Sequence, residues 1–181
     1  EVDLGLSSRK AIYSPFPQAV PSAYLINPHE CLGRNPVVCN KCVEVCRKNC
    51  IDFTMNDEVI MEHVGTIIVA TGVTPYDPSE MDEYGYTRFT NVVTSLELER
   101  LLSTGGPLLG HIGRPSDLKQ PQRIGFVQCV GSRTHNLERG NPYCSNICCM
   151  NTIKAAQYLK DNHPEIDSTV FYMDLRAFGK G

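Results

Sequence analysis

The chain has 181 residues, of which 41% are apolar and 20% are charged, and its net charge at pH 7 is −3. A chain of this length and composition can bury a core in one or two compact units. It contains no apolar run of membrane-spanning length, no signal-peptide pattern and no block of basic residues. We therefore expect neither a membrane span nor a role in nucleic-acid binding.

The nine cysteines form two groups, separated by a long segment without cysteine. A disulfide scaffold is disfavoured, because nine is an odd number and such scaffolds belong to small secreted chains. The adjacent residues Cys148 and Cys149 are also badly placed for ordinary bridging on a helix. We interpret both groups as metal-binding.

Residues 1–30 predict an extended lead-in segment. Four prolines fall within residues 14–30, and proline both fixes its own backbone and disfavours helix in the residue before it. The alternation within residues 23–26 predicts a short strand, and Asn27-Pro28 predicts a turn before the first cysteine group.

The first cysteine group has the spacing Cys31-x7-Cys39-x2-Cys42-x3-Cys46. The last three positions keep the spacing of bacterial ferredoxins, and the first gap is longer. Closely spaced thiolates on a tight loop can hold three corners of a [4Fe-4S] cluster, with a more distant cysteine at the fourth. Tetrahedral zinc is the alternative, but zinc ribbons use two separated C-x2-C pairs and only one is present here. We expect a ferredoxin-like cluster-binding insert over residues 31–58.

Two residues depart from a simple ferredoxin pattern. Arg47 follows Cys46 where ferredoxins have proline, and Cys50 stands where a small apolar residue is usual. Cys50 could be a ligand of a partner's cluster, an alternative ligand of the same cluster, or a buried small apolar side chain. We favour the third interpretation.

Residues 51–64 predict a hairpin with its turn at residues 56–58. The next run, residues 65–72, is rich in β-branched residues and predicts a central buried strand. This run ends in Ala70, Thr71 and Gly72. Such a triplet closes the FAD domain of two-dinucleotide-fold flavoproteins, yet any buried strand can end in a glycine turn, so the triplet alone decides nothing.

Residues 74–121 predict a connector of turns around one helix, residues 95–103. Ser95 is the expected N-cap, and Gly105-Gly106 ends the helix. We assign no chemistry to this connector, since it contains no lysine-bearing phosphate loop and its histidines have no ligand spacing.

A β-α-β unit is predicted after the connector, with strands at residues 123–128 and 168–173 and a helix over residues 144–160. In the helix, one stripe at 3.6-residue spacing comprises Cys144, Cys148, Thr152, Ala155, Ala156 and Leu159. Four cysteines lie where the first strand gives way to the helix, at the usual cofactor position of an α/β domain: Cys129, Cys144, Cys148 and Cys149. Four thiolates there indicate a metal cluster, and a helix N-terminus favours its negative charge.

The first turn of this unit lacks the G-x-G-x-x-G sequence that binds a dinucleotide. Asp174, after the second strand, stands where a Rossmann domain contacts the ribose. We nevertheless expect no nicotinamide nucleotide, because the glycines that admit a pyrophosphate are absent.

Several distinctive segments follow one another along the chain. They are residues 16–21 (FPQAVP), the first cysteine run, 64–72 (VGTIIVATG), 91–97 (NVVTSLE), 114–117 (RPSD), 128–133 (QCVGSR), 141–144 (NPYC), Cys148-Cys149 and 171–174 (FYMD). In content and order they resemble the A subunit of heterodisulfide reductase and its close relatives. The resemblance covers nearly the whole chain.

The resemblance implies an α/β fold: part of a thioredoxin-reductase-like, two-dinucleotide-fold flavoprotein with an inserted ferredoxin-like iron-sulfur loop. On this basis residues 1–30 would be an extended lead-in segment of the FAD domain, and residues 31–58 would be the cluster-binding insert. Residues 59–122 would contain the end of the FAD domain and a connector. Residues 123–181 would form the β-α-β unit that carries the second cluster. The FAD-domain glycine motif is absent, so the chain is expected to be the middle of such a subunit.

The resemblance also implies two [4Fe-4S] clusters and FAD. The ligand sets are Cys31, Cys39, Cys42 and Cys46 for one cluster and Cys129, Cys144, Cys148 and Cys149 for the other; Ala70, Thr71 and Gly72 would form one wall of a flavin site. No catalytic side chain is assigned.

In this family the flavin splits electron pairs between a high-potential and a low-potential acceptor. The implied function is that of an oxidoreductase subunit in a cytoplasmic complex of methanogenesis. Its partners would be other heterodisulfide-reductase-like subunits, a hydrogenase or formate dehydrogenase module that donates electrons, and ferredoxin. The alternative is a scaffold module stabilised by structural zinc, without electron transfer.

Overall fold

The computed structural model describes residues 2–33, 39–56 and 58–178, and the chain divides into two compact units. One unit comprises Glu1–Ser8 with Thr74–Gly181, and the other comprises Arg9–Val73. The secondary structure is mixed, with short α-helices, 3-10 turns and two small sheets. The chain is therefore of the α/β class.

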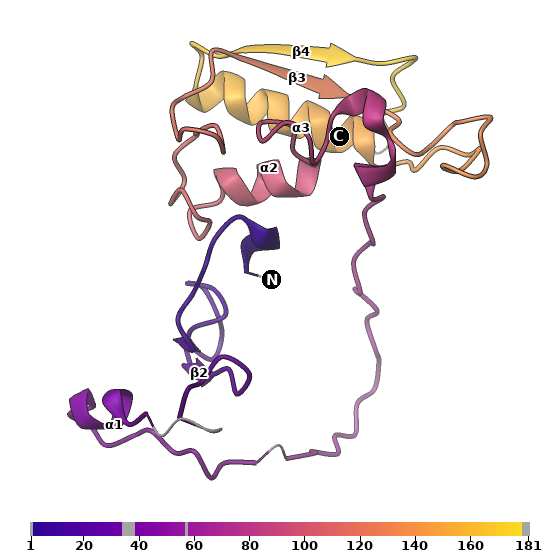
Figure 1. Cartoon of the computed structure of the whole chain (residues 1–181). Coiled ribbons are helices and arrows are strands. Elements are labelled where there is room, and N and C mark those ends of the chain that lie inside the picture. Colours follow the sequence, from indigo (N-terminus) through magenta and orange to yellow (C-terminus); the bar gives the residue numbers. More distant parts are fainter. Residues whose placement is uncertain (1, 34–38, 57, 179–181) are drawn as a thin grey trace. The chain divides into compact units, whose positions relative to one another are not determined.

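The larger unit is built on the predicted β-α-β arrangement. Strands β3 (Arg123–Val127) and β4 (Asp167–Phe171) pair in parallel, with Arg123 opposite Asp167 and Val127 opposite Phe171. Helix α3 (Cys148–Asn162) connects them, and Figure 1 shows it lying between the sheet and helix α2 (Ser95–Leu102). The predicted strand-helix-strand order is confirmed.

Helix α3 begins four residues later than predicted. Asn146 has a left-handed φ of 60°, which interrupts the helical backbone, and Ile147 at the N-cap provides no side-chain hydrogen bond. Cys144 therefore lies in the preceding loop. The buried side chains of α3 are Cys149, Thr152 and Leu159, so the predicted stripe is correct at its C-terminal end but starts at Cys149.

Hydrogen bonds between side chains and backbone define both ends of helix α2. Thr94, rather than the predicted Ser95, is the N-cap: its hydroxyl accepts from the Glu97 backbone N–H at 3.2 Å, and the Glu97 carboxylate accepts from the Thr94 N–H at 2.6 Å. At the other end, the Arg100 guanidinium donates to the Gly105 carbonyl at 2.6 Å. A Cβ on Gly106 would lie 1.9 Å from the Arg100 carbonyl oxygen, so this turn requires glycine.

Short 3-10 turns make up the rest of the regular structure in this unit. They are η1 (Asp3–Gly5), η2 (Pro78–Glu80) and η3 (Asp82–Tyr84). The first of them places a tight turn in the lead-in segment, which was expected to be extended, with Leu4 in a left-handed conformation at a φ of 59°. No helix in the described part of the chain is long and apolar enough to cross a bilayer.

The smaller unit contains a two-stranded antiparallel sheet and one helix. Strand β2 (Leu25–Ile26), within the strand predicted at residues 23–26, pairs with β1 (Ile12–Tyr13). Helix α1 (Lys41–Val45) is a short helix in the first cysteine group.

The predicted hairpin at residues 51–64 and the predicted buried strand at residues 65–72 are wrong for the described residues. No strand is formed there, and the side chains of Ile67, Ile68 and Val69 are 79%, 87% and 79% exposed. Figure 1 shows this stretch as an extended trace. A β-branched run favours strand only where neighbouring backbone supplies the ladder hydrogen bonds, and none of the described residues does so here.

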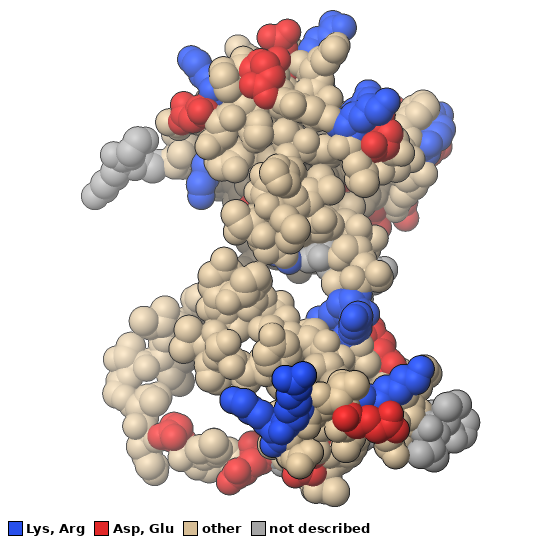
Figure 2. Space-filling view, turned by 90° about the vertical axis from the view of Figure 1, so that its left-hand side faces the viewer, with Lys and Arg blue, Asp and Glu red and all other residues tan. Residues whose placement is uncertain are grey.

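Charges of both signs are interspersed on the face shown in Figure 2. Lysine and arginine total 17 against 20 aspartates and glutamates, so neither sign dominates.

Candidate metal centres

The second cysteine group lies at the carboxyl end of β3. Cys129 follows the strand with a left-handed φ of 60°, while Cys148 and Cys149 form the first turn of α3. Because α3 starts where β3 ends, residues distant in sequence meet at this edge. The backbone N–H of Cys129 donates a hydrogen bond to the Cys148 thiol.

The Cys129 thiol lies within electrostatic reach of Cys144 and Cys148. Burial raises the pKa of the Cys129 thiol, and the nearby thiolates of Cys148 and Cys144 raise it further, against an opposing hydrogen bond from Arg133. Burial also acts to raise the pKa of Cys148, but hydrogen bonds from Cys129 and Ser145 outweigh it, so this pKa lies below its ordinary value. A lowered thiol pKa favours the thiolate, which is the form that binds metal.

The loop between Cys129 and Cys144 is held by close packing of glycines. Gly131 has a φ of 71°, and a Cβ there would lie 2.3 Å from the ring of Tyr76, whose hydroxyl donates to the Arg139 carbonyl at 2.7 Å. A Cβ on Gly140 would lie 2.8 Å from the Gly131 carbonyl oxygen. The loop thus returns Cys144 towards the end of β3.

A buried side-chain hydrogen bond joins β3 to α3 beside the cysteines. The Gln128 amide donates to the Thr152 hydroxyl at 2.5 Å, and both residues are buried. Gln128 directly precedes Cys129, and Thr152 lies one helical turn after Cys148. This bond therefore fixes the separation of the strand end and the helix start that carry the two thiols.

Cys149 differs from the other cysteines of its group. It is only 5% exposed, and its sulfur accepts from the Arg176 backbone N–H at 3.4 Å. Its thiol is directed towards the segment that follows β4. The structure thus brings Cys129, Cys144 and Cys148 within electrostatic range of one another, with Cys149 adjacent on the buried side of α3.

Two arginines and one aspartate lie beside these cysteines. Arg133 forms an ion pair with both carboxylate oxygens of Asp174, and the Arg176 Nε lies 3.4 Å from the same carboxylate. The hydrogen bond from Arg133 makes the largest contribution to lowering the pKa of the Asp174 carboxyl group. From the sequence, Asp174 stands where a Rossmann domain contacts the ribose of a nucleotide. In the structure its carboxylate is paired with the guanidinium groups of Arg133 and Arg176. Arg133 was not singled out, although it lies within the QCVGSR segment.

The first cysteine group lies in the smaller unit. Helix α1 carries Cys42, and Cys46 is its C-cap, so these cysteines are one turn apart. A Cβ on Gly33 would lie 3.6 Å from the Cys31 sulfur and 2.7 Å from the Cys39 carbonyl oxygen, so Cys31 and Cys39 approach each other around this glycine. Residues 34–38, within the long first gap of the motif, lie outside the described residues.

Cys50 is not the buried apolar side chain that we favoured. It is exposed, and its sulfur lies 3.5 Å from that of Cys46. The backbone N–H of Cys50, followed by its thiol, lowers the pKa of Cys46, and the hydrogen bond between the thiols raises the pKa of Cys50. The left-handed Asn49, with a φ of 47°, turns the chain so that the two thiols meet.

Substitution of Cys50 by serine tests its part in metal binding. Cys31, Cys39, Cys42 and Cys46 already complete a ferredoxin-type set, so we expect the iron content of the Cys50→Ser protein to equal that of the unsubstituted protein. Iron analysis on anaerobically purified protein measures this, with Cys42→Ser as the matched variant that loses iron. A drop of about four iron atoms in Cys50→Ser would instead make Cys50 a ligand.

Both cysteine groups offer donor sets made of thiols alone. Among the described residues, no three His, Cys, Asp or Glu side chains converge at a point where one metal ion could be held. Thiolates bind the separate iron atoms at the corners of an iron-sulfur cluster, and they also bind structural zinc. The all-thiol composition of both groups also suits iron and sulfide.

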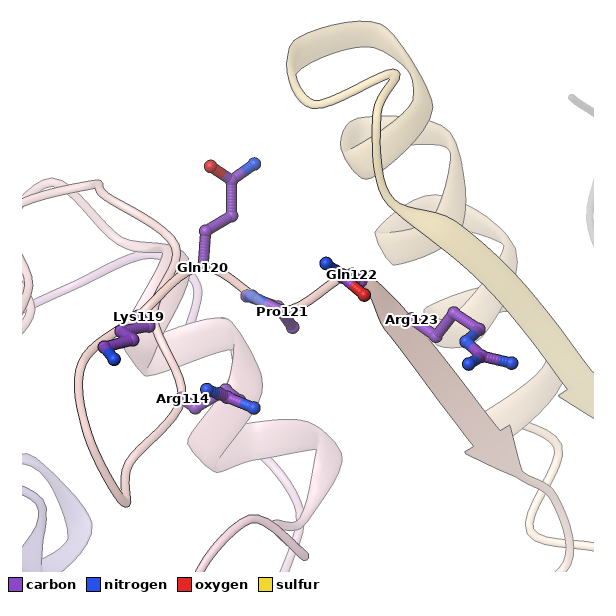
Figure 3. Close-up of a pocket in the computed structure, with 6 residues that line it drawn as sticks. All are labelled: Arg114, Lys119, Gln120, Pro121, Gln122 and Arg123. Carbon is purple, nitrogen blue, oxygen red and sulfur yellow. The ribbon is translucent and has the colours of Figure 1, made fainter.

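The residues predicted to form one wall of a flavin site, and a pocket in the larger unit, both lie apart from the two cysteine groups along the chain. Ala70, Thr71 and Gly72 are exposed, and Gly72 has a φ of 74°. The pocket, shown in Figure 3, lies where the connector enters the amino end of β3, whereas Cys129 follows its carboxyl end. It is lined by Arg114, Lys119, Gln120, Pro121, Gln122 and Arg123.

No family model matches the chain. Curated relatives match it along its whole length. The second iron-sulfur A subunit of CoB-CoM heterodisulfide reductase from Methanopyrus kandleri is 51% identical over 181 residues, covering 100% of this chain and 26% of the relative. The A subunit of H(2):CoB-CoM heterodisulfide,ferredoxin reductase from Methanothermobacter marburgensis is 48% identical over 179 residues, covering 99% and 26%. The A subunit of ferredoxin:CoB-CoM heterodisulfide reductase from Methanosarcina acetivorans is 39% identical, and the match covers 99% of this chain and 26% of the relative. The chain thus spans about a quarter of the length of these relatives.

Proposed function

Since the chain belongs along its whole length to the family of the A subunit of heterodisulfide reductase, an oxidoreductase component, we propose that it relays electrons through two [4Fe-4S] clusters. The observation that carries this proposal is the approach of Cys129 to Cys148 where β3 ends and α3 begins, with the loop before Cys144 tied back to the same edge by the hydrogen bond from the Arg133 N–H to the Tyr143 carbonyl. Cys149 completes the second ligand set. Cys31, Cys39, Cys42 and Cys46 form the first, in a ferredoxin-like insert over residues 31–58.

FAD is the proposed junction between the two clusters. The stretch ending in Ala70, Thr71 and Gly72 joins the first cysteine group to the larger unit along the chain, and the left-handed Gly72 allows a close approach of backbone to a ligand. A flavin exchanges electrons singly or in pairs, which would let it divide pairs between two acceptors. The thioredoxin-reductase-like fold, including residues 1–30 and 59–122 as parts of the FAD domain, belongs to this proposal.

The partners follow from the same proposal. The names of the relatives refer to ferredoxin, hydrogen and the CoB-CoM heterodisulfide. We propose that this chain works in a cytoplasmic complex with other heterodisulfide-reductase-like subunits. Ferredoxin would be one electron acceptor, and a hydrogenase or formate dehydrogenase module would be the electron donor.

Quantitation of iron, sulfide, zinc and flavin in protein purified without air tests the proposal. We expect at least about eight iron atoms per chain, because each cluster holds about four. Equal amounts of acid-labile sulfide and broad absorbance in the visible should accompany the iron. Stoichiometric zinc with little iron would overturn the proposal in favour of a structural scaffold. Saturable binding of NADH or NADPH near Asp174 would contradict the placement of a cluster at the β3 end.

A further inference from the structure

Three charged side chains form a fixed network at the carboxyl ends of β3 and β4. Arg133 lies in the loop after β3, whereas Asp174 and Arg176 lie in the segment after β4. The Asp174 carboxylate is shared by both guanidinium groups, bidentately with Arg133 and at 3.4 Å with Arg176. Two positive charges and one negative charge leave this network with a net charge of +1.

The network contacts the sulfur atoms of the second cysteine group at two points. The Arg133 guanidinium donates a hydrogen bond to the Cys129 thiol. On the other side, the backbone N–H of Arg176 donates to the Cys149 sulfur at 3.4 Å. The charged guanidinium of Arg133 thus contacts one of the four proposed ligands, whereas Arg176 contacts a second through its uncharged backbone N–H.

Arg133 is held in place more firmly than a surface arginine. Its side chain is only 20% exposed, and its backbone has a left-handed φ of 57°. Its backbone N–H donates to the Tyr143 carbonyl at 3.1 Å, so the residue before Cys144 is tied to it. A bidentate pair with a carboxylate also restricts the orientation of the guanidinium plane, which a lysine could not reproduce.

Building on the proposed function, we propose that Arg133 raises the reduction potential of the cluster at Cys129, Cys144, Cys148 and Cys149, and that Asp174 is the positioning residue that holds Arg133 against Cys129. Reduction of the cluster adds one electron and therefore one negative charge to the cluster and its thiolates. A neighbouring positive charge and a hydrogen bond to sulfur stabilise the reduced form. No bond is broken and no proton moves, because the guanidinium remains protonated throughout.

The effect is expected to come mainly from Arg133, whose side chain is 20% exposed, whereas those of Asp174 and Arg176 are 47% and 42% exposed. Charge interactions are stronger where solvent is excluded, and they are less screened by salt. Replacement of Arg133 by glutamine removes the charge while it keeps a polar side chain. At a fixed solution potential we expect about a tenfold smaller ratio of reduced to oxidised cluster, which for one electron corresponds to a lowering of about 59 mV.

The test is a redox titration of anaerobically purified protein, followed by electron paramagnetic resonance, with dithionite as the reductant. The signal of the second cluster is identified as the one missing from a Cys148→Ala protein. Arg133→Gln is compared with Asp174→Asn, which leaves the guanidinium in place but removes its carboxylate. The matched control is Arg114→Gln, because Arg114 forms a similar bidentate pair with Asp117, at 3.0 and 2.5 Å, in the connector of the same unit.

The inference is supported if Arg133→Gln lowers the potential, Asp174→Asn also lowers it because Arg133 is no longer held against Cys129, and Arg114→Gln leaves it unchanged, all with equal iron content. An unchanged potential in Arg133→Gln protein that retains its iron overturns the inference. If Arg133→Gln loses the cluster, Asp174→Asn decides: a lowered potential supports the inference, and an unchanged potential, or the rise that loss of the carboxylate charge alone would give, overturns it. If the unsubstituted protein has no iron at these cysteines, the proposed function itself fails, which is a separate result.

Discussion

Replacement of Cys148 by alanine is expected to remove the second cluster and with it about four iron atoms per chain. Cys148 begins α3, receives a hydrogen bond from the Cys129 backbone, and has a pKa below its ordinary value, so its thiolate is favoured for iron binding. Its loss leaves one corner of the cluster without a protein ligand. Iron analysis and visible absorbance measure the effect.

The same substitution should stop flavin-linked turnover while it leaves the spectrum of the first cluster intact. The proposed ligands of the first cluster, Cys31, Cys39, Cys42 and Cys46, lie in the other compact unit. Lys154→Ala is the matched control, because this residue is exposed on the same helix and should alter neither iron content nor turnover. Survival of turnover after loss of the cluster would make the cysteines at the start of α3 structural.

Replacement of Leu159 by alanine is expected to lower the free energy of unfolding by about 2–5 kcal/mol. Leu159 has 0% of its surface exposed, and it is the one fully buried large side chain identified among the described residues. Truncation would remove apolar contacts and leave a cavity on the face of α3 that carries Thr152 and Cys149. Denaturation by urea under anaerobic conditions, followed by circular dichroism, gives the midpoint and its change.

The control for this change is Lys160→Ala, at the exposed neighbouring position of the same helix. Exposed substitutions of this kind usually alter stability by no more than about 0.5 kcal/mol. Equal midpoints for Leu159→Ala and Lys160→Ala would show that α3 does not contribute to the core in solution. A large loss for Leu159→Ala alone would confirm that the buried face of α3 contributes to the core of this unit.

The β-α-β unit was predictable from sequence because its signals are local. An apolar run bounded by polar residues favours strand, and the stripe from Thr152 to Leu159 repeats with the helical period. The cysteine spacings likewise led to the prediction that both groups bind metal, which remains a prediction. Parallel pairing of β3 and β4 then followed from the helix between them.

Other features depended on contacts between residues distant in sequence. The run at residues 65–72 has the composition of a buried strand, yet a strand needs backbone partners, and the described residues supply none. The start of α3 was misplaced because the left-handed Asn146 interrupts a stripe that continues in sequence. Cys50 was expected to be buried, but the turn at Asn49 leaves it exposed beside Cys46.

The sequence by itself determined the residue types available for chemistry and the order of the elements that carry them. Only the tertiary structure decided which of them meet. The Arg133–Asp174 pair spans 41 positions, and no local pattern indicates it. It forms because parallel strands bring their carboxyl ends to one edge of the sheet, where the loop after β3 and the segment after β4 lie together beside the cysteines.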